Sequence, residues 1–392
     1  MFSDPVDDEV SPDLLADAVS WRHHLHRYPE IAFKEHQTAE FIATRLSQFG
    51  YSVHRGLAGT GVVGTLTRGT SRRTIGIRAD MDALPIQECS GVQYESCLTG
   101  AMHACGHDGH VAMALAAAGA CAKASNTDGT VRFIFQPAEE NEGGAKRMIE
   151  EGLFRLFPCE VIYALHNWPA LPLGTFVALQ GAMLAAFGTF EIVVSGRGCH
   201  GALPHEGTDC ILAGCHLISA LQSIVSRSID PRHAAVISVT QVQGGDTWNV
   251  IPNTCTIRGT TRWFEPSTGD ALECRMRDLS HSVATAFGCE ATLTYMRRYP
   301  ATINERRATE LIRRVASTAS INLASVETLP STGSEDFAYM LQAVPGCYVL
   351  LGAGKNTISP NLHSPHYDFN DELLPLGTKL WVSLIREYLR RT

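Results

Sequence analysis

The stretch Ala101-Met-His-Ala-Cys-Gly-His-Asp-Gly-His110 places Cys105 and His107 one residue apart, directly before the apolar run at residues 111–120. That run consists of strong helix formers, so both side chains are expected in a loop and the first turn of a helix. A thiolate and an imidazole suit zinc and related ions, but two ligands are too few for a metal site. Any further ligands must come from other parts of the chain.

Four predicted strands, at residues 74–79, 130–135, 160–165 and 347–351, lead into polar side chains that could supply them. These side chains are, in the same order, Asp80 with Asp82, Glu139 with Glu140, His166, and His363 at the end of a Gly-rich loop. Helical stretches at residues 111–124 and 144–151 separate some of these strands. The sequence therefore predicts an α/β fold with a mixed, largely parallel sheet and flanking helices. In such sheets the site lies beyond the carboxyl ends of the strands, so these side chains should face one crevice.

Residues 187–299 follow a different pattern. Strands are expected at residues 187–194, 234–242, 255–263 and 289–295, and helices at residues 209–227 and 266–287. The order β-α-β-β-α-β is typical of ferredoxin-like α+β domains. We therefore divide the chain into a first part at residues 1–186, an inserted domain at 187–299, and a second part of the host domain at 300–392. The host fold should resume with a helix at residues 305–321.

Composition excludes several classes of protein. The net charge of -8 provides no basic surface for nucleic acid, and no run approaches the length of an apolar membrane span. The twelve cysteines are scattered, which is typical of reduced thiols in a cytoplasmic protein. No nucleic-acid or membrane partner is expected.

Two shorter motifs point elsewhere. Gly59-Thr-Gly-Val-Val-Gly64 matches the dinucleotide-binding fingerprint, but it leads into a strand pattern at residues 62–67 and lacks a strand before it. His24-Leu-His26 resembles the paired histidines of barrel amidohydrolases, yet it lies within the first of two helices predicted for residues 11–50. A turn into a strand and a structural role are the preferred interpretations.

The preferred metal ligands are Cys105, His107, Glu140, His166 and His363. Five donors exceed a closed tetrahedron and suit two neighbouring ions. Neighbouring residues in an extended chain point opposite ways, so one of the two glutamates could bind metal while the other moves protons, and spacing alone does not decide which. Asp82 and Glu335 are candidates for orienting a ligand imidazole, or are turn or cap carboxylates.

Nine segments along nearly the whole chain form a recognisable set: Trp21-Arg-His-His-Leu-His-Arg-Tyr-Pro-Glu30, Ile77-Arg-Ala-Asp-Met-Asp-Ala-Leu-Pro85, Met102 to His110, Phe135-Gln-Pro-Ala-Glu-Glu140, His166-Asn-Trp-Pro169, Gly196-Arg-Gly-Cys-His200, Asn249-Val-Ile-Pro252, Gly333-Ser-Glu-Asp-Phe337 and Leu362-His-Ser-Pro365. In these segments the chain resembles a known family, the M20 metallopeptidases, in the branch of hippurate and auxin-conjugate hydrolases that act on N-acyl amino acids.

The resemblance implies a zinc-exopeptidase-like catalytic domain and an inserted lid or dimerisation domain. It places the metal on the five preferred ligands and the general base on Glu139, and it implies that His200 serves an active site, often that of a partner subunit. Asn249 matches a position thought to line the substrate site, or is a turn residue, and His200 could instead be a core histidine. Arg262 is a candidate partner for the substrate carboxylate, or forms a surface ion pair. Cys199 stands where the family commonly has glycine, so a local change in that turn is expected.

The expected function is metal-dependent hydrolysis of the amide bond of N-acyl amino acids, of the hippurate or N-acetyl type, by a homodimer or higher homo-oligomer. Two divalent ions per subunit are expected, either Zn²⁺ or Mn²⁺, Co²⁺ or Ni²⁺. The alternatives are a dipeptidase or aminopeptidase of the same fold, and a metal-binding scaffold without turnover. A nicotinamide oxidoreductase has only the Gly59 loop in its favour. The sequence leaves open the acyl group, the amino acid, the stereochemistry, the metal and the number of subunits.

Overall fold

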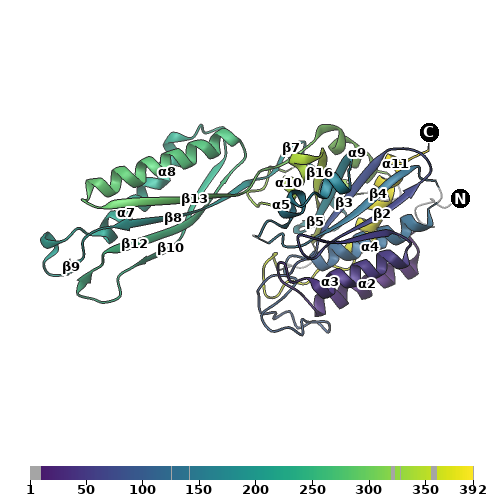
Figure 1. Cartoon of the computed structure of the whole chain (residues 1–392), viewed down its shortest axis with the longest axis horizontal. Helices are drawn as coiled ribbons and strands as arrows, with labels where there is room; N and C mark the ends of the chain where they lie inside the picture. Colours follow the sequence, from purple (N-terminus) through teal and green to yellow (C-terminus); the bar gives the residue numbers. More distant parts are fainter. Residues whose placement is uncertain are drawn as a thin grey trace. The chain divides into compact units, whose positions relative to one another are not determined.

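The computed structural model describes residues 10–124, 126–140, 142–318, 323–326, 328–354 and 360–391. Its contacts divide the chain into two units, whose elements are labelled in Figure 1. Unit 1 comprises Met1–Met183, Ile303–Leu329 and Asp336–Thr392, and unit 2 comprises Leu184–Thr302 and Pro330–Glu335. This division begins and ends the insert three residues outside the predicted bounds. It also adds a short second segment to unit 2 that the sequence did not indicate.

Unit 1 is built on an eight-stranded sheet with the order β1-β2-β4-β3-β5-β16-β6-β15. Strands β3, β4, β5 and β16 run parallel to their neighbours in this group, whereas β1, β2 and β6 add antiparallel pairs. The prediction of a mixed, largely parallel sheet is confirmed. The strands are β1 (Ser52–Leu57), β2 (Gly61–Arg68), β3 (Thr74–Asp80), β4 (Gly129–Gln136), β5 (Val161–Pro172), β6 (Thr175–Val177), β15 (Ala324–Ser325) and β16 (Gly346–Gly354).

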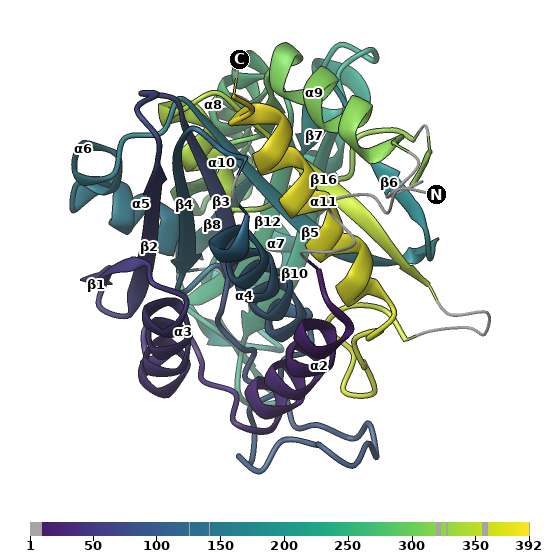
Figure 2. The ribbon, with the colours of Figure 1, turned by 90° about the vertical axis from the view of Figure 1, so that its right-hand side faces the viewer.

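Helices cover this sheet, and Figure 2 shows α2, α4 and α11 lying together in front of it. Every residue of α4 from His107 to Cys121 is buried, because its alanine-rich sequence has no polar face and lies between the sheet and the outer helices. The metal-ligand candidate His107 therefore opens a helix in the middle of the core. The helices are α2 (Pro12–Arg27), α3 (His36–Gln48), α4 (His107–Lys123), α5 (Gly144–Glu150), α6 (Leu153–Leu156), α9 (Arg306–Ala316), α10 (Phe337–Ala343) and α11 (Leu373–Tyr388).

Three local predictions differ from the structure. A strand that was not predicted, β1, precedes the glycine loop at residues 59–64. The chain then enters β2, the antiparallel partner of β1, and not the helix that a dinucleotide site requires. Strand β5 continues to Pro172 beside β16, which places His166 inside the strand and not after it. The helix predicted for residues 305–321 is α9, and residues 319–322 lie outside the described part of the chain.

Unit 2 contains an antiparallel sheet with the order β10-β12-β8-β13, and its elements follow the predicted β-α-β-β-α-β order. They are β8 (Ala186–Ser195), α7 (Cys210–Ser223), β10 (Ala235–Gly244), β12 (Thr254–Trp263), α8 (Pro266–Ala286) and β13 (Glu290–Tyr299). Two short strands of this unit, β9 (Cys199–His200) and β11 (Val250–Ile251), pair with each other. A second short pair is formed by β7 (Gly181–Leu184) and β14 (Thr302–Asn304), most of whose residues belong to unit 1. Single turns at Pro204–Glu206 and Ile224–Ser228 complete the unit.

The segment Cys210–Ser228 is long and apolar enough to cross a membrane by length and composition, and only a third of it is buried. One such helix is weak evidence for a membrane span, so the expectation of no membrane partner stays a prediction. One face of α7, including Leu217 and Leu221, packs into the core of unit 2, while Ile211 and Leu212 on the other face are exposed. A helix that packs one face on the core and has an apolar outer face can have the same length and composition as a membrane span, so these two properties do not distinguish them.

Candidate metal centre

Side chains from four distant parts of unit 1 converge on one cluster. The ligand atoms of Cys105, His107 and His166 lie within 4.8 Å of one another, and so do those of Cys105, Glu140 and His363. A third group of the same kind joins His107, Glu140 and Glu139. Cys105 Sγ is 3.3 Å from His166 Nε2, and Glu140 Oε1 is 3.2 Å from His363 Nε2. The structure thus brings together all five residues predicted to bind metal, in overlapping triads that share members.

The sheet register and one glycine explain this convergence. Asp80 on β3 pairs with Gln136 on β4, four residues before Glu140, so β3 and β4 end at the same level. Gly106, between Cys105 and His107, has φ +86°, and a Cβ there would lie 2.5 Å from the side-chain oxygen of Asn167. Only glycine accepts both conditions without strain, so Gly106 lets the chain turn sharply into α4 with both donors directed to the cluster.

The chemistry of these donors fits divalent ions. Two of the three candidate histidines use Nδ1 to donate to a backbone carbonyl, His107 to Asp82 at 2.9 Å and His166 to Asn167 at 2.7 Å, which leaves Nε2 as the nitrogen available to a metal ion. His107 Nε2 and Glu140 Oε1 are buried and make no hydrogen bond to a described residue, although Glu140 Oε1 lies 3.2 Å from Nε2 of the exposed His363. Buried acceptors of this kind are costly when unpaired, and cations would satisfy them.

The electrostatics of the cluster agree with this view. Burial raises the pKa of the Cys105 thiol well above its usual value, and the carboxylates of Glu140 and Glu139 raise it further. Burial alone would lower the pKa of His107, but Asp80 and Asp82 outweigh it and raise this pKa to about 10. Burial, reinforced by His110, lowers the pKa of His166 well below its usual value. This concentration of negative charge favours either protons or metal ions in the cluster.

The two glutamates do not follow the sequence expectation. Both carboxylates reach the same cluster, so the prediction that neighbours point opposite ways is wrong here. The physical reason is that Ala138 has φ +55°, which turns the chain just before Glu139 instead of extending it. Glu139 Oε1 accepts the Asp336 N–H at 3.4 Å, whereas Glu140 Oε1 faces His363.

Asp82 lies against two of the candidate ligands. Its Oδ1 is 3.3 Å from His107 Nδ1, and its Oδ2 accepts the Glu140 N–H at 3.0 Å. These contacts favour an orienting role over a turn carboxylate. Glu335 is buried in the short second segment of unit 2.

Several supporting residues were missed in the sequence. His110 Nδ1 contacts Asp80 at 2.6 Å, and its Nε2 contacts the Asn167 side-chain oxygen at 2.7 Å. The Asn167 amide in turn donates to the Tyr367 hydroxyl at 2.6 Å. This chain fixes the segment that carries His166. His110 stood in the opening motif, but nothing in the sequence pairs Asn167 with Tyr367.

A buried arginine underlies the cluster. The Arg78 side chain donates to Asp80 at 2.7 Å, to Gln136 at 2.7 Å and to Asp336 at 3.2 Å, and all four residues are buried. Asp336, which follows the predicted Glu335, also accepts from the Ala145 N–H at 2.8 Å. Arg78 therefore neutralises two carboxylates that anchor β3 and the start of α10.

We expect Arg78→Met to lower the free energy of unfolding by about 3–5 kcal/mol, because it removes the buried guanidinium that Asp80 and Asp336 share. Chemical denaturation measures this loss. Arg147→Met is the matched control, since its pair with Glu151 is solvent-exposed and should contribute less than about 1 kcal/mol. Equal effects of the two substitutions would contradict the assigned role of Arg78.

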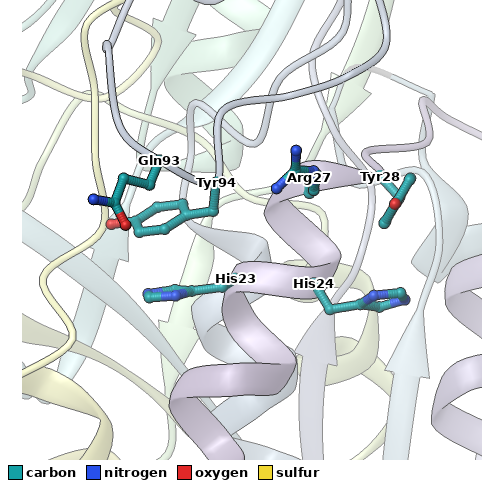
Figure 3. A pocket seen from close by; sticks show the side chains of 6 residues that line it. All are labelled: His23, His24, Arg27, Tyr28, Gln93 and Tyr94. Carbon is teal, nitrogen blue, oxygen red and sulfur yellow. The ribbon is translucent and has the colours of Figure 1, made fainter.

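The histidines of α2 do not form a second metal site. His26 is buried between Asp108 at 2.8 Å and Glu88 at 2.9 Å, whereas His24 is exposed. Figure 3 shows His24 beside Tyr28 and His23 beneath Tyr94, on the two sides of a surface pocket of about 490 Å³. Since His24 and His26 lie in different environments, the paired-histidine motif of barrel amidohydrolases is not formed.

The candidates in unit 2 lie on short segments. His200 on β9 pairs with Val250 on β11, next to Asn249, and both His200 and Asn249 are exposed. His200 Nδ1 accepts the Ala202 N–H at 3.1 Å, so the ring proton lies on Nε2, where it can be donated. Cys199 is partly buried on the same short strand.

Arg262 forms no ion pair among the described residues. Its guanidinium donates to the Thr332 carbonyl at 3.2 Å and stacks on the Phe187 ring at 4.1 Å, and burial lowers its pKa. The surface ion pair considered from the sequence is therefore not formed by this arginine within the described chain.

The chain is similar to several known proteins along most of its length. Residues 76–387 match the profile of Peptidase family M20/M25/M40. Hippurate hydrolase of Campylobacter jejuni is 38% identical over 379 residues, covering 96% of this chain and 98% of that protein. An IAA-amino acid hydrolase of Arabidopsis thaliana is 38% identical over 379 residues, covering 95% and 86%. A Bacillus subtilis structure described as a dinuclear metal binding peptidase from the M20 family has a TM-score of 0.84 and 31% identity, covering 97% and 99%.

Proposed function

Because the chain belongs to peptidase family M20/M25/M40, we infer that it is a metal-dependent hydrolase of the amide bond of N-acyl amino acids. The products are a carboxylic acid and a free amino acid. One observation carries this conclusion most directly. One cluster, largely buried and exposed at His363, joins the Cys105 thiol, three imidazoles, the Glu140 carboxylate and a second carboxylate, Glu139, which a purely structural metal site does not need.

We propose that Cys105, His107, Glu140, His166 and His363 hold two divalent ions. Zn²⁺ is one choice for a thiolate, imidazole and carboxylate set, and Mn²⁺, Co²⁺ and Ni²⁺ are the others. When bound, such ions acidify water and polarise a carbonyl group. His363 closes the cluster from a loop in which its own φ is +64°, a strained value for a residue with a Cβ. The Asp82 carbonyl oxygen accepts a hydrogen bond from Nδ1 of His107, so that Nε2 is the nitrogen that binds the metal ion.

Glu139 is proposed as the general base and acid. Its carboxylate takes a proton from the attacking water and then passes it to the leaving nitrogen of the amide. Its Oε1 is held by the Asp336 N–H, and Asp336 is itself held by Arg78 and Gln136. A carboxylate fixed in this way keeps its position while the proton moves, which reduces the reorganisation needed in the transition state.

His200 and Asn249 are proposed to act on the substrate from unit 2. The Nε2–H of His200 can donate to the oxyanion that develops on the amide carbonyl. The Asn249 side chain can bind the substrate by its amide. Arg262 is proposed to pair with the substrate carboxylate, since it lacks an ion pair within the described chain. Because Cys199 directly precedes His200 on β9, its thiol should lie near the bound substrate.

A substrate comparison tests this function. N-benzoylglycine, N-acetyl amino acids and indole-acyl amino acids should be hydrolysed by metal-loaded protein, and an unblocked dipeptide should not. Preference for the dipeptide would favour a peptidase of the same fold. No hydrolysis of any of them by protein that binds two ions would favour a scaffold without turnover.

Metal binding should release protons. The raised pKa values of Cys105 and His107 mean that both groups carry protons at pH 7 without metal, and each must lose about one proton to coordinate. Metal affinity should therefore rise as the pH increases from 6 toward 10. Titration calorimetry in buffers of different ionisation enthalpy measures the number of protons released. Cys105→Ser should release fewer, and binding without proton release would contradict the assignment of these two ligands.

We propose that the chain forms a homodimer or higher homo-oligomer through unit 2. The exposed apolar side chains there include Ile211 and Leu212 on α7, Val250 on β11, and Trp248 just before that strand. A water-soluble enzyme would cover such residues in a subunit contact. Light scattering should show a dimer or larger species, and Leu212→Glu should shift it toward monomer. We also propose a cytoplasmic location, since all twelve cysteines are free.

A further inference from the structure

One buried carboxylate outside the metal cluster contacts the chain just before Glu139. Glu35, the residue before α3, has no exposed surface. Its Oε1 accepts the N–H groups of Phe33 and Ala138, both at 3.0 Å, and its Oε2 accepts the Thr60 hydroxyl at 2.7 Å. Three donors therefore converge on this carboxylate, and none of them belongs to a metal-ligand candidate.

The two backbone N–H groups bonded to Glu35 belong to unusual residues. Phe33 has φ +60° and Ala138 has φ +55°, and they are two of four non-glycine residues with positive φ in the described chain. A side chain in this left-handed region costs about 1–2 kcal/mol. Such strain persists only where the surroundings hold it. The Glu35 carboxylate therefore supplies the hydrogen bonds that keep both residues in this conformation.

The turn at Ala138 is clamped from its other side as well. The Ala138 carbonyl accepts the Gly144 N–H at 2.9 Å, and a Cβ on Gly144 would lie 1.8 Å from the Pro137 carbonyl oxygen. Ala138 and Gly144 are thus held close together, and Glu35 bonds to the Ala138 N–H. The direction in which Glu139 leaves this turn depends on the backbone conformation of Ala138.

We propose that Glu35 is a positioning residue, whose carboxylate holds the left-handed turn at Ala138 and thereby sets the place of the Glu139 carboxylate. This proposal rests on the proposed hydrolase function, in which Glu139 moves the proton. Glu35 does not touch the substrate. Its effect is transmitted through one hydrogen bond to the residue that precedes the acid–base group.

The first test replaces Glu35 with leucine, which removes the acceptors while keeping similar bulk. We expect kcat to fall by about 10- to 100-fold, because loss of a residue that positions a catalytic group usually lowers activity by this factor. KM should change by less than about threefold, since Glu35 does not touch the substrate. Glu35→Gln should retain most of the activity, since the amide oxygen can still accept the Ala138 N–H. An unchanged kcat in Glu35→Leu would overturn the proposal.

A matched control separates positioning from loss of stability. Glu30 caps the same helix α3 through the N–H groups of Gln37 and Thr38, at 3.1 and 2.9 Å, and does not contact Ala138. Glu30→Leu should therefore destabilise the protein with little change in kcat. Equal losses of kcat in the Glu30 and Glu35 variants would show that Glu35 acts only through stability.

A second substitution gives a more specific test. Glycine adopts positive φ at little cost, so Ala138→Gly should need less support from Glu35. The kcat of the double variant Glu35→Leu with Ala138→Gly should be about tenfold higher than the kcat of Glu35→Leu alone. Failure to recover any activity would contradict the claim that Glu35 acts through the Ala138 turn.

An activity-independent measurement distinguishes this inference from the proposed function. Hydrogen exchange of the segment 136–140 should be faster in Glu35→Leu than in wild type and unchanged in Glu30→Leu. If the wild type hydrolyses no N-acyl amino acid, the proposed function fails, and faster exchange still supports the hold of Glu35 on this turn. If the wild type is active and exchange is unchanged, the proposal for Glu35 fails alone.

Discussion

Glu139→Gln should lower kcat for an N-acyl amino acid by about 10²- to 10⁴-fold, which is the usual contribution of a general acid–base group. The amide side chain keeps the size of the carboxylate and can still accept the Asp336 N–H. It cannot accept a proton from water at neutral pH. The metal content of the variant should equal that of the wild type, since the five proposed ligands are unchanged.

Steady-state kinetics combined with elemental analysis checks this expectation. Glu142→Gln is the matched control, because Glu142 is an exposed carboxylate two residues beyond Glu140, and its kcat should not change. If Glu139→Gln lost metal while Glu140→Gln kept it, the roles of the two glutamates would be reversed.

Cys105→Ala should have the next largest effect. Cys105 belongs to two of the overlapping triads, so its loss removes a donor from both proposed ion positions. The ions are expected to contribute several kcal/mol to transition-state stabilisation, so kcat should fall by about 10³-fold or more. Metal content should fall below two ions per chain. Dialysis against a defined metal concentration, followed by elemental analysis, measures it.

Another buried cysteine provides the control for this substitution. Cys347 lies in β16, and its Sγ contacts the Thr309 hydroxyl at 3.5 Å, away from the ligand triads. Cys347→Ala should lower stability by creating a small cavity while leaving metal content at the wild-type value. A Cys105→Ala protein with full metal content and activity would show that the thiol is not a ligand.

The parts of the site that follow from sheet geometry could be predicted from the sequence. Asp82, Glu140 and His166 were placed in one crevice because parallel strands present their carboxyl ends at one edge. Cys105 and His107 were placed beside them because a helix-forming run follows directly. These inferences need only the alternation of strands and helices along the chain.

The parts that depend on tertiary packing could not be predicted. Nothing in Gln136-Pro-Ala-Glu-Glu140 indicates that Ala138 adopts a positive φ, because the hydrogen bond that holds it comes from Glu35, 103 residues away. Asp336 and Asn167 were missed for the same reason, since their partners lie on other elements. The prediction that the Glu139 and Glu140 side chains point opposite ways was wrong, because it assumed an extended chain where a turn is held from outside.

The edges of the sheet were also poorly predicted. Strand β1 is largely exposed and shows little apolar alternation, and β6 and β15 contain three and two residues. Short edge strands carry almost no periodic signal. The outer face of α7 could not be identified from the sequence, because its core-facing and exposed residues are both apolar and composition does not reveal which face is covered.

The central claim is that Cys105, His107, Glu140, His166 and His363 hold two divalent ions beside an uncoordinated Glu139. Anomalous diffraction from crystals grown with Zn²⁺ or Mn²⁺ tests it most directly. The account predicts two anomalous peaks within about 2.0–2.4 Å of donors from these five residues, with both Glu139 oxygens outside that distance. Ions bound elsewhere, or Glu139 as a ligand in both positions, would contradict it.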